Sequence, residues 1–298
     1  MGKEIYDNHI AAREVFEEVN DSLSKNLSDI IFNGPQETLT LTENAQPSIM
    51  CVSMAVMRVL EEEFKFNTRD HISYFAGHSL GEYTALAASN SISISDASKI
   101  LLFRGKSMQK SSPSWATCMA AFMGADLKKI EGIISETSRS KEICDIANYN
   151  TETQIVISGD DAAINRAIVL ANEQKIRTVK LDVSAPFHSN YMIDTAKALQ
   201  EEFAKLTFKA PEIKVISNFK ALPFTDAKDI EEGLIKQTYS TVRWYESIKY
   251  MQDLNTNSFY EIGFGSTLCG IVKRIDRSLQ LNSVCSSKEI ETLAKEIL

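Results

Sequence analysis

The chain has 298 residues, of which 44% are hydrophobic and 24% are charged, and its formal net charge is −8. This composition is typical of a globular protein with a substantial core, built as one large domain or as a large and a small one. No apolar stretch approaches the roughly 20 residues of a bilayer span, and the first residues lack an apolar h-region. We therefore expect no membrane segment, and the negative charge argues against non-specific binding to nucleic acid.

Five cysteines are scattered along the chain without Cys-x-x-Cys spacing. Their odd number and wide separation argue for a reducing compartment and against a zinc site. The expectation is a soluble cytoplasmic protein that binds no metal.

The first third of the chain is expected to be mainly helical. Pro47 is placed at the start of a helix because its missing N–H costs nothing there, and Asp96 is placed as a helix N-cap. The expected elements are helices over 11–20, from 47 through 60, over 82–88 and from 96 to about 108, with a short buried strand at 72–76.

From residue 119 the pattern changes to β-α-β-β-α-β, the ferredoxin-like order. It predicts a small inserted subdomain over about 119–184. The expected elements are strands at 119–123, 143–149, 154–158 and 178–183, and helices at 127–137 and 162–174. After the insertion, helices near 192–206, 230–239 and 245–254 alternate with strands near Val215 and Phe259, which indicates a return to an α/β layer architecture.

The segment Gly77-His78-Ser79-Leu80-Gly81 lies between the predicted strand at 72–76 and the helix at 82–88. A strand, a Gly-x-Ser-x-Gly turn and a helix form the nucleophile-elbow arrangement. The turn exposes the serine oxygen, and the helix behind it supplies backbone N–H groups and a partial positive charge that suit an oxyanion. Ser79 is therefore predicted to be a nucleophile, with a purely structural turn as the alternative.

A serine hydroxyl needs a base, which is usually a histidine. Of the four histidines, His9 lies in a polar segment and is expected to be solvated, and His71 precedes the strand at its remote end. His78 is the direct neighbour of Ser79 and should point elsewhere. His188 remains, at the exit from the inserted subdomain, where clefts often form. It is predicted to be the base by exclusion, with an ordinary surface-loop histidine as the alternative.

Arg104 follows the apolar helical run at 100–103 and precedes Gly105. Its guanidinium could bind a carboxylate through two parallel hydrogen bonds. Composition alone favours the simpler alternative, an exposed helix arginine whose stem packs on apolar neighbours. The glycine-rich stretch at 263–270 lacks Gly-x-Gly-x-x-Gly spacing, so it predicts a tight turn and no dinucleotide site.

The full string Gly77-His78-Ser79-Leu80-Gly81-Glu82-Tyr83 is far more specific than Gly-x-Ser-x-Gly, and it resembles the signature of malonyl-CoA:acyl carrier protein transacylases. The resemblance covers nearly the whole chain. Further stretches that match this family in order are 46–48, 103–108, 148–150 with 154–159, 184–189, 242–244 and 260–263.

The resemblance implies an α/β fold with a hydrolase-like core that contains a parallel sheet. It assigns this core to residues 1–118 and 185–298 and a ferredoxin-like insertion to 119–184. The family opens with a short strand and a Pro-Gly-Gln-Gly-Ser-Gln turn, whose first glutamine gives a second oxyanion N–H. The match here begins downstream of both, at Met1-Gly2-Lys3, so Met1 is expected to be a start assigned too late or an engineered boundary.

By resemblance, Ser79 attacks the malonyl thioester, His188 is the base and Arg104 binds the free malonyl carboxylate. The same resemblance implies an oxyanion N–H from Leu80, orientation of His188 by the backbone carbonyl of Gln237, and a cleft lined by Asn150 and the turn at 263–265. Phe264 departs from the family, which often has proline there, but it touches none of the implied chemistry.

The implied reaction has two half-reactions at one site, in which a malonyl-serine ester forms and is then taken up by the phosphopantetheine thiol of acyl carrier protein. Ping-pong kinetics are expected, with no cofactor and no metal. The partners are malonyl-CoA and acyl carrier protein, the role is fatty acid biosynthesis, and a monomer is expected. Because such carrier proteins are acidic, a local basic patch must receive them, for which we suggest Lys175, Arg177 and Lys180.

Two other functions remain open from the sequence. A serine hydrolase or thioesterase could use the same Ser79 and His188, but it would have no need of a carboxylate partner such as Arg104. The second alternative is a non-catalytic binding protein that is inactive because its N-terminal strand is missing. Phe187 beside His188 would crowd a branched acyl group, which favours malonyl over methylmalonyl.

Overall fold

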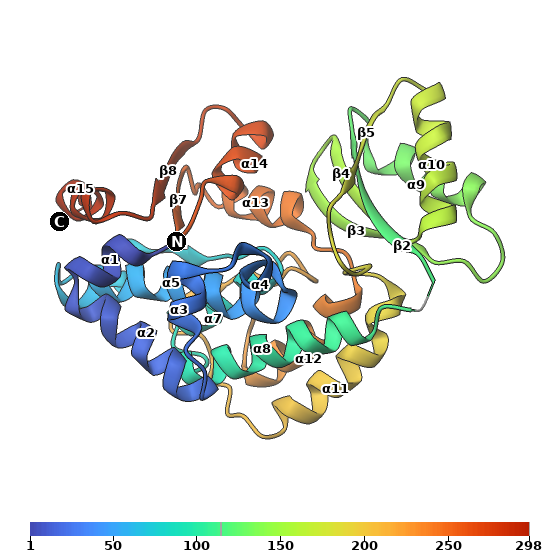
Figure 1. The fold of residues 1–298 in the computed structure, drawn as a ribbon. Coiled ribbons are helices and arrows are strands. Elements are labelled where there is room, and N and C mark those ends of the chain that lie inside the picture. Colours follow the sequence, from blue (N-terminus) through green and yellow to red (C-terminus); the bar gives the residue numbers. More distant parts are fainter. Residues whose placement is uncertain (114, 298) are drawn as a thin grey trace.

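The computed structural model has a larger part and a smaller lobe beside it (Figure 1). Helices with one apolar face build most of the larger part. The structure describes residues 1–113 and 115–297, so Ser114 and Leu298 lie outside it. Helix α5 contributes the centre of the main core, and α2, α7 and α8 pack against it. The helices before the lobe are α1 (Lys3–Asn8), α2 (Ile10–Leu23), α3 (Leu27–Asn33), α4 (Gln36–Thr40), α5 (Thr42–Glu62), α6 (Thr68–His71), α7 (Leu80–Ala88) and α8 (Ile94–Lys110).

Two helix starts differ from those expected. Pro47 lies inside α5, because the helix already begins at Thr42. Asp96 lies in the first turn of α8, where its charge is favourable near the helix N-terminus. The cap is Ser93, whose Oγ accepts a hydrogen bond from the Asp96 N–H at 3.0 Å.

The smaller lobe, here called the inserted lobe, runs from Thr117 to Leu181 and has the expected β-α-β-β-α-β order. Its four strands form one antiparallel sheet in the order β3-β4-β2-β5. Phe122 and Ile155 on the sheet pack with Ile130 and Ile164 from the two helices in a separate apolar core. The elements are β2 (Thr117–Met123), α9 (Leu127–Thr137), β3 (Cys144–Thr151), β4 (Gln154–Asp160), α10 (Asp161–Glu173) and β5 (Arg177–Leu181).

The larger part, here called the core, has two parallel strand pairs, β1 with β6 and β7 with β8, which the structure describes as separate small sheets. The strand expected at 72–76 is only two residues long.

None of the described helices is both long and apolar enough to cross a membrane. The elements are β1 (Tyr74–Phe75), η1 (Asn190–Met192), α11 (Ile193–Phe203), β6 (Lys214–Val215), α12 (Ala227–Tyr239), α13 (Trp244–Asp253), β7 (Ser258–Ile262), α14 (Thr267–Ile275), β8 (Gln280–Val284) and α15 (Ser287–Ile297).

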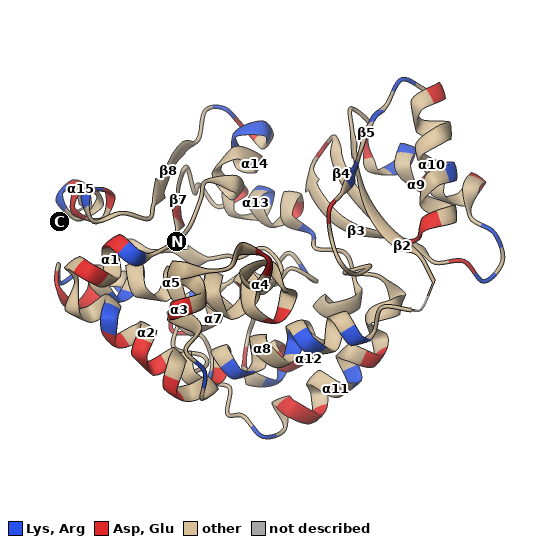
Figure 2. Cartoon of the chain, viewed as in Figure 1, with Lys and Arg blue, Asp and Glu red and all other residues tan. Residues whose placement is uncertain are grey.

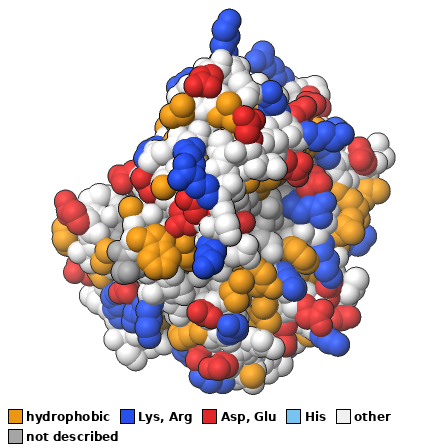
Figure 3. Space-filling view, turned by 90° about the vertical axis from the view of Figure 1, so that its right-hand side faces the viewer, with side chains coloured by type: hydrophobic (Ala, Val, Ile, Leu, Met, Phe, Trp, Pro, Cys, Tyr) orange, Lys and Arg blue, Asp and Glu red, His pale blue; other side chains and the backbone are white. Residues whose placement is uncertain are grey.

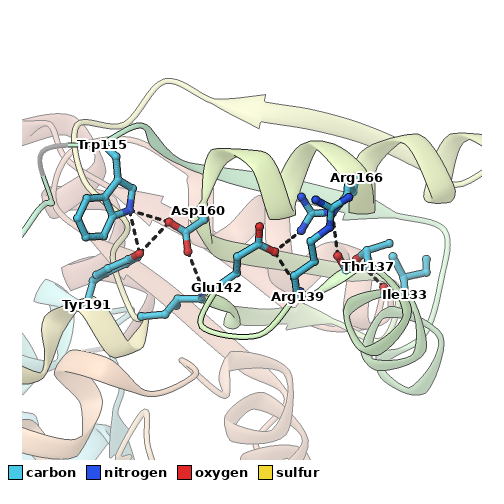
Figure 4. Close-up of polar contacts among 9 residues, drawn as sticks. Trp115, Ile133, Thr137, Arg139, Glu142, Asp160, Arg166 and Tyr191 are labelled. Carbon is cyan, nitrogen blue, oxygen red and sulfur yellow. Dashed lines mark hydrogen bonds and ion pairs between the residues drawn. The ribbon is translucent and has the colours of Figure 1, made fainter.

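Hydrogen bonds join the inserted lobe to the segments that enter and leave it, and Figure 4 shows those of Asp160 with Trp115 and Tyr191. Asp160 Oδ1 accepts from Trp115 Nε1 at 2.7 Å and from the Tyr191 hydroxyl at 2.8 Å. Asp145 Oδ2 accepts from the Asn190 N–H at 2.7 Å. Two carboxylates of the lobe therefore hold the segment that directly follows His188.

Candidate active site

Ser79 lies at the turn between β1 and α7, with φ 54° and ψ −109°, a conformation that strains any residue with a side chain. Gly77 permits this turn, because a Cβ added there would lie 1.9 Å from the Gly81 carbonyl oxygen. Asn218 secures the turn from both sides. Its Oδ1 accepts from the Ser79 N–H at 2.7 Å and its Nδ2 donates to the Gly77 carbonyl at 2.8 Å.

His188 is brought to Ser79 from 109 residues away, with its Nε2 2.7 Å from the serine Oγ. Its Nδ1 lies 2.9 Å from the Gln237 backbone carbonyl, which can only accept, so Nδ1 carries the proton and Nε2 is open to the serine hydroxyl. Burial and the nearby Arg104 charge lower the pKa of His188 to about 3. The imidazole is therefore neutral at pH 7 and able to take a proton.

Arg104 is only 1% exposed, so the expectation of an exposed helix arginine is wrong. Its Nη1 donates to Gln46 Oε1 at 2.6 Å, and its Nη2 donates to Ser79 Oγ at 3.1 Å and to Gln237 Oε1 at 3.0 Å. Within residues 1–113 and 115–297 it forms no ion pair with a carboxylate. A buried guanidinium with neutral partners is costly, and an anionic ligand would offset that cost.

Leu80 and Asn150 lie on either side of the serine turn. Leu80 is the first residue of α7, so its N–H points out of the helix N-terminus beside Ser79. Asn150 Oδ1 lies 3.0 Å from His78 Nε2, so this ring nitrogen of His78 pairs with Asn150. Asn150 is itself 8% exposed.

The two remaining histidines do not reach this site. His71 stacks on Phe66. His9, expected to be solvated, is instead held between Glu63 at 2.6 Å and Ser287 at 2.9 Å.

Three polar side chains of the site were not predicted from the sequence. Gln46 holds Arg104, Asn218 holds the serine turn, and the fully buried Glu82 accepts from Gln237 Nε2 at 2.7 Å. One signal for Asn218 exists, since it follows β6, the parallel neighbour of β1, and ligand sites gather at the carboxyl ends of parallel strands.

A hollow of about 480 Å³ lies beside His188, between the inserted lobe and the core. Asp145 and Ile146 line it from β3, and Tyr239 and Thr241 line it from the core. Among the residues that the structure describes, no three His, Cys, Asp or Glu side chains lie close enough together to hold a metal ion.

Comparison with known proteins gives a consistent set of relatives. Residues 1–293 match the family described as the acyl transferase domain. A malonyl CoA-acyl carrier protein transacylase of Bacillus subtilis (strain 168) is 39% identical over 294 residues, which cover 98% of this chain and 90% of the relative.

Solved structures agree with that match. An acyl-carrier-protein-S-malonyltransferase from Bartonella henselae has a TM-score of 0.96 and 40% identity, covering 100% of this chain and 94% of that chain. A malonyl-transacylase in complex with its type II PKS acyl-carrier protein has a TM-score of 0.93 and 29% identity, covering 98% and 94%.

Proposed function

The chain belongs to the acyl transferase domain family, and on that premise we propose that it moves a malonyl group from malonyl-CoA to the phosphopantetheine thiol of acyl carrier protein. Relatives that cover almost all of the chain carry this activity in their names. The observation that carries the proposal is Arg104, a buried cation without a carboxylate partner, 3.1 Å from the nucleophile. The product serves fatty acid biosynthesis.

In the first half-reaction, Ser79 Oγ attacks the thioester carbon while His188 Nε2 takes the hydroxyl proton. The Gln237 carbonyl at Nδ1 stabilises the imidazolium that forms. The carbon–sulfur bond then breaks, His188 returns the proton to the leaving thiolate, and coenzyme A departs as a thiol. A malonyl ester remains on Ser79.

The second half-reaction runs through the same atoms in reverse. The carrier thiol gives its proton to His188 and attacks the ester carbon. The carbon–oxygen bond breaks and Ser79 recovers the proton. In both steps the Leu80 N–H and the α7 N-terminus stabilise the negative oxygen of the tetrahedral intermediate.

Arg104 supplies selectivity in this scheme. The malonyl carboxylate is separated from the acyl carbon by one methylene, and the guanidinium already touches the atom to which that carbon becomes bonded. Nη1 and Nη2 can both donate to the carboxylate. We assign Asn150 to the wall of the substrate cleft, where its Oδ1 lies 3.0 Å from His78 Nε2.

The same Ser79 and His188 could serve a thioesterase, and one experiment separates the two. Incubation with malonyl-CoA should release about one equivalent of coenzyme A and leave a malonyl group on Ser79, detected by peptide mass, until carrier thiol is added. Ser79→Ala should release none. Continuous release without a carrier would instead support hydrolysis.

We also assign the fold more finely. The strand order of the inserted lobe supports a ferredoxin-like subdomain over 119–184, and the serine turn between a parallel strand and a helix supports a hydrolase-like core over 1–118 and 185–298. Since Ser79, His188 and Arg104 all come from one chain, we propose that the monomer is active. Five free cysteines support a cytoplasmic location.

Lys175, Arg177 and Lys180 are our candidates for carrier docking. All three are exposed, at the turn before β5 and on β5 itself. Lys180 already pairs with Asp161 at 3.0 Å, which reduces its share of the charge. Figure 3, which views the molecule from the right-hand side of Figure 1, shows basic and acidic side chains interspersed. Lys175 and Arg177 are therefore the main candidates for binding the acidic carrier.

A further inference from the structure

Glu82 is a completely buried carboxyl on α7 that the mechanism above does not use. Both of its oxygens accept hydrogen bonds, Oε1 from the Asn218 N–H at 3.1 Å and Oε2 from Gln237 Nε2 at 2.7 Å. Burial raises the pKa of this carboxyl to about 8, although the hydrogen bonds from Asn218 and Gln237 and the charge of Arg104 act to lower it. Each oxygen faces an N–H donor, so both oxygens are held in place as acceptors.

The side-chain amide of Gln237 has a donating end and an accepting end, and its surroundings distinguish them. Its Nε2 lies between two acceptors, the Ser79 carbonyl at 2.7 Å and Glu82 Oε2 at 2.7 Å. Its Oε1 accepts from Arg104 Nη2 at 3.0 Å. Rotation of the amide by half a turn would set its NH₂ against the guanidinium and its oxygen against two acceptors, which is unfavourable at every contact.

Glu82 does not touch Arg104 itself. The amide of Gln237 stands between them, so the guanidinium is held by the neutral oxygens of Gln237 and Gln46. A carboxylate in direct contact would neutralise the arginine and compete with an anionic ligand. This arrangement fixes the position of the guanidinium and leaves its charge available.

We propose that Glu82 is a positioning residue for the acyl carboxylate: it sets the orientation of the Gln237 amide, which in turn holds the Arg104 guanidinium beside Ser79. The proposal rests on the malonyl transfer proposed above. It predicts that loss of Glu82 harms a malonyl substrate more than an acetyl substrate, because acetyl has no carboxylate to be received.

The first test compares single-turnover rates of Ser79 acylation by malonyl-CoA and acetyl-CoA. In Glu82→Gln, the new amide can present its oxygen to Gln237 or to Asn218, but not to both. We expect the malonyl-to-acetyl rate ratio to fall about 10-fold, the effect of losing one hydrogen bond to a charged group. Glu18→Gln is the matched control, since Glu18 accepts from the Ser95 N–H and hydroxyl outside this network, and its ratio should be unchanged.

The second test asks whether Glu82 acts through Gln237. Gln237→Met removes the amide but keeps the backbone carbonyl that orients His188. If the proposal holds, adding Glu82→Gln to Gln237→Met lowers the rate ratio no further, whereas independent effects would multiply. Glu82→Asp keeps the carboxyl group but shortens its reach, and it replaces Glu82→Gln in both tests if that variant does not fold.

An equal loss with both substrates, or multiplying effects in the double variant, would show that Glu82 only supports the fold and would overturn the proposal. A wild-type protein that transfers no malonyl group is a different result, because it would contradict the proposed function itself.

Discussion

At the scale of single residues, we propose that Arg104 determines which acyl group the site favours. Its two terminal nitrogens donate hydrogen bonds to the neutral oxygens of Gln46, Gln237 and Ser79. Arg104→Ala should therefore lower kcat/KM for malonyl-CoA by roughly 100-fold or more, the order of effect of removing one partner of a buried charge pair.

Acetyl-CoA gives the comparison for this variant, since its transfer needs no cation and should fall much less. Arg58→Ala, on α5, removes an arginine that pairs with Glu62 at 3.1 Å and should change neither substrate. Equal losses for malonyl-CoA and acetyl-CoA in Arg104→Ala would remove Arg104 from the selective role.

His188 makes the stability of the fold depend on pH. Its folded pKa is lowered to about 3, whereas an unfolded histidine titrates near about 6.5. Between these values the unfolded chain binds the additional proton, so the free energy of unfolding falls as pH falls. Between pH 7 and pH 5, this one group should lower the free energy of unfolding by about 2 kcal/mol.

Urea denaturation at the two pH values measures this fall, and His188→Gln should show a smaller one. Burial also lowers the pKa of His78, so part of the fall should persist in the variant. An identical fall in both proteins would mean that His188 is not held neutral.

Whether a site residue could be predicted from the sequence depends on how far away in the chain its partners lie. Ser79 could be predicted from its own turn and His188 by exclusion among four histidines, and the structure brings the two together. Arg104 looked like a surface residue because nothing nearby in the sequence shows what buries it. Glu82 could not be assigned a role, because its partner Asn218 lies 136 residues away in the chain.

At the scale of elements, the serine turn depends more on Gly77 than on Gly81. A Cβ at Gly77 would overlap the Gly81 carbonyl, whereas a Cβ at Gly81 meets nothing within 4 Å. Gly77→Ala should lower the free energy of unfolding by about 3 kcal/mol or more and abolish labelling of Ser79. Gly81→Ala should keep the label and gain up to about 1 kcal/mol from helix propensity.

Thermal unfolding and malonyl labelling of the two glycine variants, measured side by side, test this difference. Similar melting temperatures and similar labelling would show that the turn can relax around a side chain at Gly77, and that the close backbone approach is not required.

The long helices α2 and α8 were predicted better than the pairing of the core strands, for a physical reason. A long helix repeats its apolar spacing over several turns, as α2 and α8 do, so its existence is visible locally. Helix ends depend on a single cap, which is why Ser93 was missed in favour of Asp96. The core strands are as short as two residues, and their partners lie far away in sequence, as β1 and β6 show.

At the scale of the whole molecule, the contact between Ser79 and His188, the proposed catalytic pair, depends on both parts of the structure. Ser79 and Arg104 belong to the core, whereas the segment after His188 is hydrogen-bonded to Asp145 and Asp160 of the inserted lobe. β3 also joins the core directly, because its Tyr149 N–H donates to the Val242 carbonyl at 2.9 Å. The inserted lobe therefore helps to hold the base in place.

Charge at this scale sets how a second protein can approach. The chain carries a net charge of −8, and an acidic carrier must be attracted locally against that overall repulsion. Figure 2 shows basic residues on β5 in the inserted lobe, at the opposite end of the molecule from α1. Arg177→Glu, on β5, should therefore raise KM for acyl carrier protein about 10-fold and leave the rate of Ser79 labelling by malonyl-CoA unchanged.

Lys3→Glu, on α1, changes the net charge by the same amount at the far end, and should leave KM for the carrier near its wild-type value. The difference between the two variants should shrink as salt is added, because screening weakens attraction between exposed charges. If both variants raise KM equally, net charge alone governs the encounter. If neither does, the carrier docks elsewhere, since a charge reversal within the contact must alter attraction to an acidic surface.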